Sequence, residues 1–347
     1  MINTKLIDRA ATRTDQSEHP GRRGPVRIGA VLLALLIMAS LGACGLGTSG
    51  GYVPSARLAG PLADVPRLDG AHISVGSKNF TEQLVLAKMV EIVLKSAGAS
   101  VEDLTNIPGS ASARQAQLAG QVDVEWEYTG TAWLTYMAQP KPIRDPHEQY
   151  VAVRDKDLKE NQLVWTDPSP MNDTYGLATT EANAKKLNVK NLSDLKKLPI
   201  KERTFCLEDE FASRSDGFQP MLKAYGLKYG SDVPKKNVKI FDAGAIYSAT
   251  AKGVCNFGEV YTTDGRISAL NLSVLADDNR FFPVYNGCAV WRKEVVDKYP
   301  QTRKLVDPLA AKLTDKTMTR LNGKVDVEGQ TPTKVAEDWL RSEGFIR

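Results

Sequence analysis

The sequence predicts an α/β protein of two lobes that meet at a ligand cleft. Two observations predict the lobes: a rhythm of strand, helix and strand runs from residue 72 to about residue 128, and a second one begins near Thr174. The chain has 347 residues, which is long enough for two separate cores. The final stretch, 294–347, reads as helices with breaks at Pro300, Pro308 and Pro332.

Residues 1–43 predict the signal peptide of a bacterial lipoprotein. Three arginines, Arg22, Arg23 and Arg27, precede an apolar run at 28–39, which has the length of a signal-peptide core and is short for a membrane span. The run ends in Leu-Gly-Ala-Cys at 41–44, which resembles a lipobox. We expect Cys44 to carry the lipid, and a plain signal anchor with an incidental cysteine is the alternative.

The segment 44–71 is expected to form a lipidated flexible tether, because it is rich in Gly, Ser, Pro and Ala and shows no helical or strand periodicity. Beyond Cys44 no apolar stretch approaches about 18 residues. We therefore expect the body of the protein to lie outside the cytoplasm, anchored to the cell membrane by lipid. It is not expected to form a channel itself.

The charge of the chain excludes one class of partner. The formal net charge is +4, and without residues 1–43 the balance is 39 basic against 38 acidic side chains. Nucleic acid binding is disfavoured, because it needs a surplus of Lys and Arg on one face.

The first α/β unit is predicted from hydrophobic periodicity. Strands are expected at 73–76, 101–105 and 122–127, with helices at 82–96 and 112–119. The first helix is apolar except for a narrow stripe of Lys88, Glu91 and Lys95, so it should be mostly buried. In such sheets ligands bind beyond the carboxyl ends of strands, where residues 77–81 and 128–131 lie.

The second α/β unit is predicted in the same way. Its strands are expected at 175–178 and 204–207, and its helices at 181–187, 193–198 and 218–225.

Six motifs occur in order along the two units. They are Gly-Ser-Lys-Asn-Phe-Thr-Glu-Gln at 76–83, Glu-Tyr-Thr-Gly-Thr at 127–131, Asn-Asp-Thr-Tyr at 172–175, Phe-Ala-Ser-Arg-Ser-Asp-Gly at 211–217, Tyr-Thr-Thr-Asp-Gly-Arg-Ile at 261–267 and Phe-Phe-Pro-Val-Tyr-Asn at 281–286. With these motifs, the chain from about 72 to 347 resembles the substrate-binding proteins of ABC transporters for glycine betaine, choline and related osmoprotectants.

The resemblance implies the type II periplasmic-binding-protein fold, with two crossings between the lobes. Lobe 1 is then expected at 72–173, lobe 2 at 174–284, and a return to lobe 1 at 285–347. The resemblance also implies a monomer that delivers its ligand to an ABC permease, with no catalysis and no cofactor.

The resemblance assigns a tyrosine box to Tyr128, Tyr175, Tyr261 and Tyr285. A quaternary ammonium carries no N–H group, so a site recognises it with electron-rich aromatic faces, at about 2 kcal/mol or more per desolvated contact. The alternative is that each tyrosine only fills space in a core.

A betaine also has a carboxylate, for which Lys78, Arg214 and the Thr131 hydroxyl are the expected donors. Choline has no carboxylate and would leave the two cations unpaired in a dry cleft, which favours a carboxylated ligand. The alternative for both cations is solvated surface charge. Asp173 is expected to add a negative charge or a carbonyl near the ammonium.

Three cysteines remain after Cys44, and an oxidising compartment permits one disulfide. We expect Cys206 to pair with Cys255, because both fall in lobe 2. Cys288 is then a free thiol, or an alternative partner. A zinc site is not expected, because the sequence has no Cys-x-x-Cys pair and no close histidine cluster.

An enzyme is the competing class of protein. His72 and His147 are the histidines that follow residue 44, and neither lies in a recognisable nucleophile motif. The pair Asp277 and Asp278 reads as a solvated turn. A third hypothesis is an envelope lipoprotein of the same fold that binds or senses a different small molecule.

Overall fold

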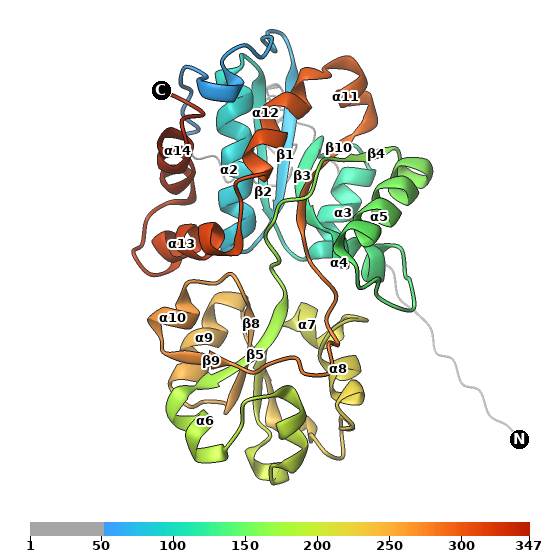
Figure 1. Cartoon of the computed structure of the whole chain (residues 1–347), viewed down its shortest axis with the longest axis vertical. Coiled ribbons are helices and arrows are strands. Elements are labelled where there is room, and N and C mark those ends of the chain that lie inside the picture. The colour runs from blue at the N-terminus through green and yellow to red at the C-terminus, as the bar shows by residue number, and fades with distance from the viewer. Residues whose placement is uncertain (1–51) are drawn as a thin grey trace, which may run out of the picture. The chain divides into compact units, whose positions relative to one another are not determined.

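The computed structural model describes residues 52–347 (Figure 1). The predicted signal peptide, Cys44 and the first part of the predicted tether lie outside the described residues. Within 52–347, no helix combines the length and the apolar character that a membrane crossing needs.

Lobe 1 is built on a five-stranded mixed sheet. Its strand order is β2-β1-β3-β10-β4, in which β1 pairs in parallel with β2 and β3, while β10 runs antiparallel to β3 and β4. All five residues of β3 are buried, because helices cover both faces of the sheet. The strands are β1 (His72–Lys78), β2 (Ser100–Ile107), β3 (Val124–Tyr128), β4 (Leu163–Trp165) and β10 (Gly287–Arg292).

The helices of lobe 1 come from both ends of the described chain. Helices α12, α13 and α14 pack against α2, so the C-terminal region returns to the first lobe (Figure 1). The helical elements are η1 (Gly60–Leu62), α2 (Thr81–Ser96), α3 (Ser110–Leu118), α4 (Thr129–Thr131), the π-helical turn η2 (Ala132–Tyr136), α5 (Pro146–Asn161), α11 (Lys293–Lys298), α12 (Gln301–Ala310), α13 (Asp315–Asp326) and α14 (Pro332–Ser342).

The polar stripe of α2 lies inside the lobe. Lys88 contacts Glu91 at 2.9 Å and also pairs with Asp103 of β2. Burial raises the pKa of Glu91 to about 8, although Lys88 acts against this shift. Lys88 and Glu91 therefore belong to an internal ion-pair network, whereas Lys95 is half-buried and donates to the Val53 carbonyl.

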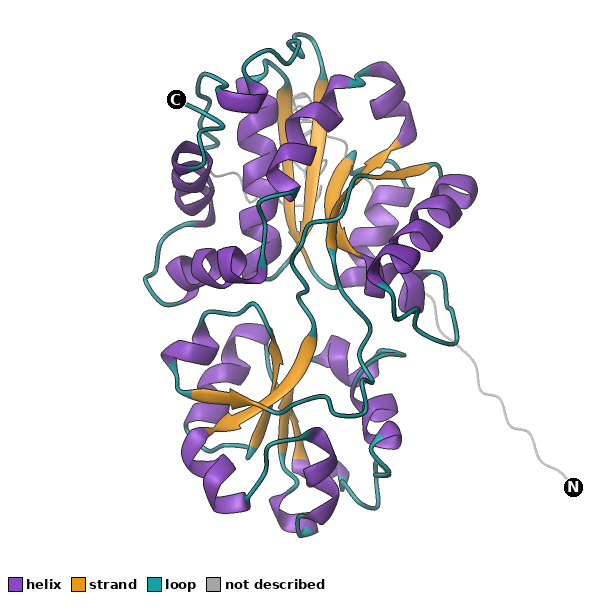
Figure 2. Ribbon diagram, in the orientation of Figure 1, coloured by secondary structure: helices purple, strands orange, loops and turns teal. Residues whose placement is uncertain are grey.

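Lobe 2 has a second five-stranded mixed sheet of order β7-β6-β8-β5-β9 (Figure 2). Strand β6 is parallel to β7 and β8, while β5 is antiparallel to β8 and β9. The elements are β5 (Tyr175–Thr180), α6 (Glu181–Leu187), η3 (Leu192–Lys197), η4 (Ile200–Glu202), β6 (Phe205–Leu207), α7 (Asp209–Ser213), α8 (Phe218–Ala224), η5 (Lys235–Asn237), β7 (Val238–Ile240), α9 (Ala243–Ala251), β8 (Phe257–Tyr261), α10 (Arg266–Ala269) and β9 (Leu272–Val274).

The cysteines of lobe 2 are joined. Cys206 of β6 and Cys255 form a disulfide with their Cα atoms 5.7 Å apart. Cys288 lies in β10 as a buried free thiol.

Two chain crossings connect the lobes. The first joins β4 to β5, and the second joins β9 to β10. Asn172 and Asn286 form an antiparallel bridge between them, and the Asn172 side chain accepts from the Tyr285 amide at 2.7 Å. The two crossings therefore hold each other at the base of the cleft.

Two sequence expectations need correction. Part of the predicted tether packs on lobe 1: Val53, Leu62 and Leu68 are buried, and the Ala59 amide donates to the Phe345 carbonyl at 2.8 Å. The segment looked flexible because its apolar residues lack periodicity, yet they cover α2 and the C-terminal residues.

Pro308 does not break the C-terminal helix and lies inside α12. A proline removes one backbone hydrogen bond and crowds the preceding turn. Here the helix ends two residues later, at Ala310, and the fully buried Leu305, Val306 and Leu309 hold it against lobe 1.

Candidate functional site

A cavity between the lobes brings together all eight residues that the sequence assigns to ligand binding. Its lining consists of Lys78, Asn79, Phe80, Ser110, Tyr128, Thr131, Asp173, Tyr175, Glu208, Glu210, Arg214, Tyr261 and Tyr285.

The carboxyl ends of strands and the two crossings position these side chains. Lys78 ends β1, Tyr128 ends β3 and Tyr261 ends β8. Asp173 lies on the first crossing and Tyr285 on the second. Glu208, Glu210 and Arg214 follow β6, and Tyr175 begins β5, which runs antiparallel to β8. The site therefore lies where ligands bind in α/β sheets.

Five aromatic rings line the cavity in one continuous series. The centroid of Phe80 lies 6.3 Å from that of Tyr128 and 4.9 Å from that of Tyr261. Tyr261 is next to Tyr175 at 5.3 Å, and Tyr175 meets Tyr285 edge to face at 5.7 Å. The four tyrosines of the predicted box therefore share one wall, and Phe80 joins its two halves.

Three of the four tyrosine hydroxyls donate to carboxylates. Tyr128 donates to Glu82 at 2.8 Å, Tyr261 to Glu208 at 2.9 Å and Tyr285 to Asp216 at 2.7 Å. A phenol that donates to an anion gains electron density on its ring. The arrangement thus strengthens the negative aromatic faces that attract a cation.

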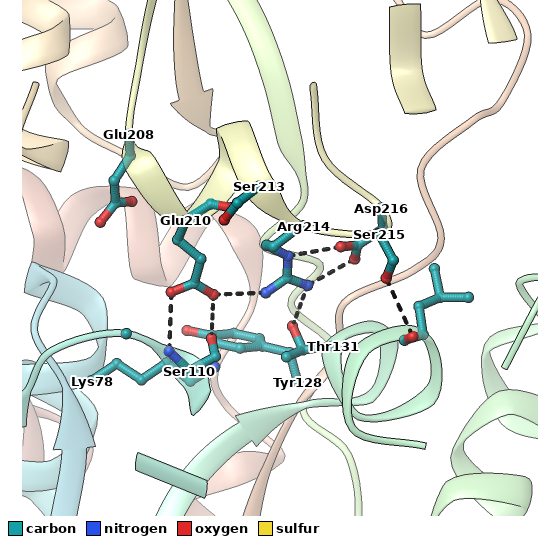
Figure 3. Close-up of polar contacts among 12 residues, drawn as sticks. Lys78, Ser110, Tyr128, Thr131, Glu208, Glu210, Ser213, Arg214, Ser215 and Asp216 are labelled. Carbon is teal, nitrogen blue, oxygen red and sulfur yellow. Dashed lines mark hydrogen bonds and ion pairs between the residues drawn. The ribbon is translucent and has the colours of Figure 1, made fainter. Parts of the chain in front are cut away.

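Both cations predicted to bind a ligand carboxylate already have acidic partners in the protein. The Lys78 ammonium lies 2.7 Å from Glu127 and over the Tyr128 ring. Arg214 binds Asp216 with two nitrogens at 2.7 Å each, and also contacts Glu210 and the Thr131 hydroxyl (Figure 3).

These pairs correct one sequence argument. A ligand without a carboxylate would not leave Lys78 and Arg214 unpaired, because the protein supplies their counter-charges. The argument that unpaired cations exclude choline therefore does not hold. Glu127 lies 49 residues from Lys78, so no local sequence signal showed the pairing.

The cavity has more acidic than basic side chains. Asp173, Glu208 and Glu210 line it together with Lys78 and Arg214. Burial raises the pKa of Glu208, and the hydrogen bond from Tyr261 opposes that shift. The pKa of Glu210 is lowered: burial acts to raise it, but the charges of Arg214 and Lys78 outweigh burial. This balance favours a cationic ligand.

Hydrogen bonds cross the cleft and hold the lobes together. Glu210 of lobe 2 accepts from the amide and the hydroxyl of Ser110 in lobe 1, at 3.0 and 2.5 Å. Arg214 donates to Thr131 of lobe 1 at 3.2 Å. Closure of the lobes therefore assembles the cavity from both sides.

The cavity lining also contains five residues that the sequence did not assign to ligand binding: Asn79, Phe80, Ser110, Glu208 and Glu210. Phe80 lies in the first motif, and its aromatic ring two residues after Lys78 was an available signal. Glu208 and Glu210 directly follow strand β6, where ligands of α/β sheets bind. Among residues 52–347 there is no group of three or more His, Cys, Asp and Glu that could hold a metal ion.

The two-lobed fold and the cavity between the lobes define a solute-binding protein of the type II periplasmic class. The chain belongs to the family described as "Substrate binding domain of ABC-type glycine betaine transport system", which it matches over residues 71–342. The family consists of transport components that bind a substrate, so the chain is a binding protein and not an enzyme.

Individual relatives agree with this assignment. The chain is 39% identical over 282 residues to a "Glycine-betaine-binding protein" of Pseudomonas aeruginosa, covering 79% of this chain and 88% of that protein. It is 31% identical over 291 residues to the "Ergothioneine transport permease/ergothioneine binding protein EgtU" of Helicobacter pylori, covering 83% of this chain and 51% of that protein. The chain thus spans about half the length of EgtU.

A solved structure shows the same fold. The crystal structure of a "glycine betaine/carnitine/choline ABC transporter" protein superimposes with a TM-score of 0.63 at 25% identity, covering 78% of this chain and 98% of that one.

Proposed function

We propose that this protein captures a quaternary ammonium osmoprotectant of the glycine betaine type outside the cytoplasm and delivers it to an ABC permease. The observation that carries the proposal is the series of aromatic rings in a cavity that has more acidic than basic side chains. Such rings attract a methylated cation, which cannot form N–H hydrogen bonds.

The ammonium half of the ligand has the stronger support. Tyr128, Tyr175, Tyr261 and Tyr285 form the box, with Asp173 beside them. A ligand carboxylate would have to share Lys78 with Glu127, and Arg214 with Glu210 and Asp216. The Thr131 hydroxyl already accepts from Arg214 at 3.2 Å, and its own hydrogen can be donated to the ligand.

Ligand binding is coupled to lobe closure. The cavity takes residues from both lobes and from both crossings, so only the closed state offers all contacts at once. The permease would recognise the closed form, in which the protein acts as a monomer.

The binding test uses the body of the protein, residues 45–347, in calorimetric and tryptophan fluorescence titrations. The ligands are glycine betaine, carnitine, choline, ergothioneine and proline, and the variants are Tyr261→Ala and Tyr229→Ala. Tyr229 lies in lobe 2 against Phe218, outside the cavity lining. Y261A should weaken binding about 30-fold, because one desolvated cation–π contact is worth about 2 kcal/mol.

The outcomes separate the fold from the ligand class. Binding of a quaternary ammonium at micromolar or lower concentration, weakened in Y261A and unchanged in Y229A, supports the proposal. If none of the four quaternary ammonium compounds binds, the osmoprotectant assignment is wrong, and the protein carries or senses another small molecule.

The lipid anchor has its own test. We propose that Cys44 is acylated and holds the protein at the cell membrane. Cys44→Ser should abolish the incorporation of a labelled fatty acid into the protein in cells. Equal labelling of the variant and the wild type would contradict lipidation at this residue.

A further inference from the structure

A buried cluster behind the ligand cavity joins the two lobes through one hydroxyl group. The Thr263 Oγ1 atom of lobe 2 lies 2.6 Å from Glu82 Oε2 in α2 of lobe 1. The same atom lies 2.8 Å from Asp173 Oδ1 on the first crossing. Glu82, Asp173 and Thr263 are 2%, 5% and 1% exposed, so water cannot separate these groups.

The hydrogen-bond count requires an additional proton. A threonine hydroxyl has one hydrogen, whereas an ionised carboxylate only accepts. Thr263 can therefore donate to one of the two carboxylates, and the second contact is a hydrogen bond only if that carboxyl group carries a proton. With both groups ionised, two buried negative charges would compete for the single hydrogen of this hydroxyl.

The surroundings indicate which group keeps the charge. Glu82 also accepts from the Tyr128 hydroxyl at 2.8 Å and from the Asn322 amide at 3.1 Å. It lies in the first turn of α2, where the helix dipole favours an anion. Among residues 52–347, the donor groups in contact with Asp173 are Thr263 Oγ1 and the Thr263 amide at 3.4 Å, whereas Glu82 has donors from three different residues. The chain of donors thus runs from protonated Asp173 to Thr263 and on to ionised Glu82.

No cation compensates this pair among the described residues. Asp264 follows Thr263 and is paired with Arg266 of α10, which also lies 3.6 Å from Asp326 of α13. Asp326 in turn accepts from Thr81 of α2. Arg266 therefore pairs with Asp264 and Asp326 rather than with Glu82 or Asp173. Burial raises the pKa of both Glu82 and Asp173, and the charge of Glu82 raises the pKa of Asp173 further.

We propose that Glu82 and Asp173 share one proton through Thr263, and that a cationic ligand in the adjacent cavity expels it. Asp173 lines the cavity, so a bound ammonium stabilises its ionised form by direct attraction. The released proton goes to the buffer, and the ligand cation replaces its charge. By linkage, ligand affinity then rises with pH, at most about tenfold per pH unit for one full proton. This coupling rests on the proposed cation-binding function.

The direct test is a calorimetric titration with glycine betaine at about pH 7, in phosphate and in Tris buffer. The two buffers differ in ionisation enthalpy, so the difference between the measured enthalpies gives the number of protons released. The wild type should release a substantial fraction of one proton per ligand, and Glu82→Gln should release almost none. Asp307→Asn is the matched control, because burial raises the pKa of Asp307 to about 6 but the residue lies in α12, away from the cavity.

A ligand-free measurement keeps the test independent of the ligand assignment. Because burial raises the pKa of both carboxyl groups, the folded wild type holds a proton that the unfolded chain gives up, so stability falls as pH rises above the ordinary carboxyl range. Thermal unfolding is compared between about pH 5 and pH 8. The melting temperature of E82Q should fall less over this range than that of the wild type, and Asp173→Asn should behave like E82Q.

The outcomes are distinct. Binding without proton release overturns the proton coupling and leaves the binding function intact. If glycine betaine does not bind, equal pH slopes for the wild type, E82Q and D173N overturn the shared proton, while reduced slopes in both variants support it.

Discussion

Phe80 of lobe 1 stacks on Tyr261 of lobe 2 with their ring centroids 4.9 Å apart and their planes inclined by 16°. The two residues are far apart in the sequence and meet only when the lobes are closed. Phe80 therefore links the halves of the aromatic wall, since it also faces Tyr128 of lobe 1 at 6.3 Å.

The first prediction concerns Phe80. Phe80→Leu keeps apolar bulk at the cavity but removes one aromatic face, so it should weaken the binding of a quaternary ammonium about tenfold. Phe241→Leu is the control, because Phe241 packs beside the disulfide of lobe 2 and does not line the cavity. Calorimetric titration checks both variants. Tighter binding by F80L would show instead that Phe80 occupies the position of the ligand.

The second prediction concerns the charge cluster of lobe 2. Arg214→Ala leaves Asp216 and Glu210 without their cation in a buried site, so the free energy of unfolding should fall by about 3–5 kcal/mol. Arg154→Ala should change it by at most about 1 kcal/mol, because Arg154 and its partner Asp155 are 40% and 60% exposed. Urea unfolding without ligand measures both. A loss below about 1 kcal/mol in R214A would contradict the structural role of the cluster.

The sequence predicted what depends on local periodicity and on motifs. The helix expected at 82–96 is α2, and the strand expected at 204–207 is β6 with one residue fewer. The motifs also placed Tyr128, Tyr175, Tyr261 and Tyr285, which the structure brings to one cavity. Each of these features is encoded within a few neighbouring residues.

Features that depend on distant contacts were not predictable. The Lys78–Glu127 pair joins two neighbouring strands, and the contact of Thr263 with Glu82 spans 181 residues. The partner of Lys88 in the polar stripe of α2 was not predictable, because Asp103 belongs to strand β2. Pro308 looked like a helix break, because the packing of Leu305 and Leu309 is a tertiary effect.

The third prediction concerns the disulfide between Cys206 and Cys255. The bond closes a loop of 49 residues, so replacing both cysteines by alanine should lower the free energy of unfolding by about 2–4 kcal/mol. Strand β6 carries Cys206 and leads directly to Glu208 and Glu210, so ligand affinity should fall as well. Cys288→Ala is the control. Reductant should lower the stability of this variant as much as it lowers the stability of the wild type. If reductant leaves the stability of the wild type unchanged, the disulfide contributes nothing.

The fourth prediction concerns Glu125 of β3, which is 1% exposed and whose two carboxyl oxygens have no hydrogen-bond partner among the described residues. Burial, followed by the charge of Glu127, raises its pKa to about 8. In an unfolded chain a glutamate has a pKa of about 4.3. Between these values the folded protein holds a proton that the unfolded chain loses, so stability falls as pH rises.

Glu125→Gln mimics the protonated form. The glutamine does not titrate, so it adds nothing to the pH dependence of stability. The variant should match the wild type at about pH 5 and be more stable at about pH 8, since one proton changes stability by about 1.4 kcal/mol per pH unit. Glu91 also has a pKa of about 8, so the stability of E125Q should still fall as pH rises, but less steeply than that of the wild type. Glu102→Gln, on the exposed side of β2, should leave the wild-type slope unchanged. Thermal unfolding across this range measures the difference, and parallel curves for E125Q and the wild type would show that Glu125 is ionised in the folded protein.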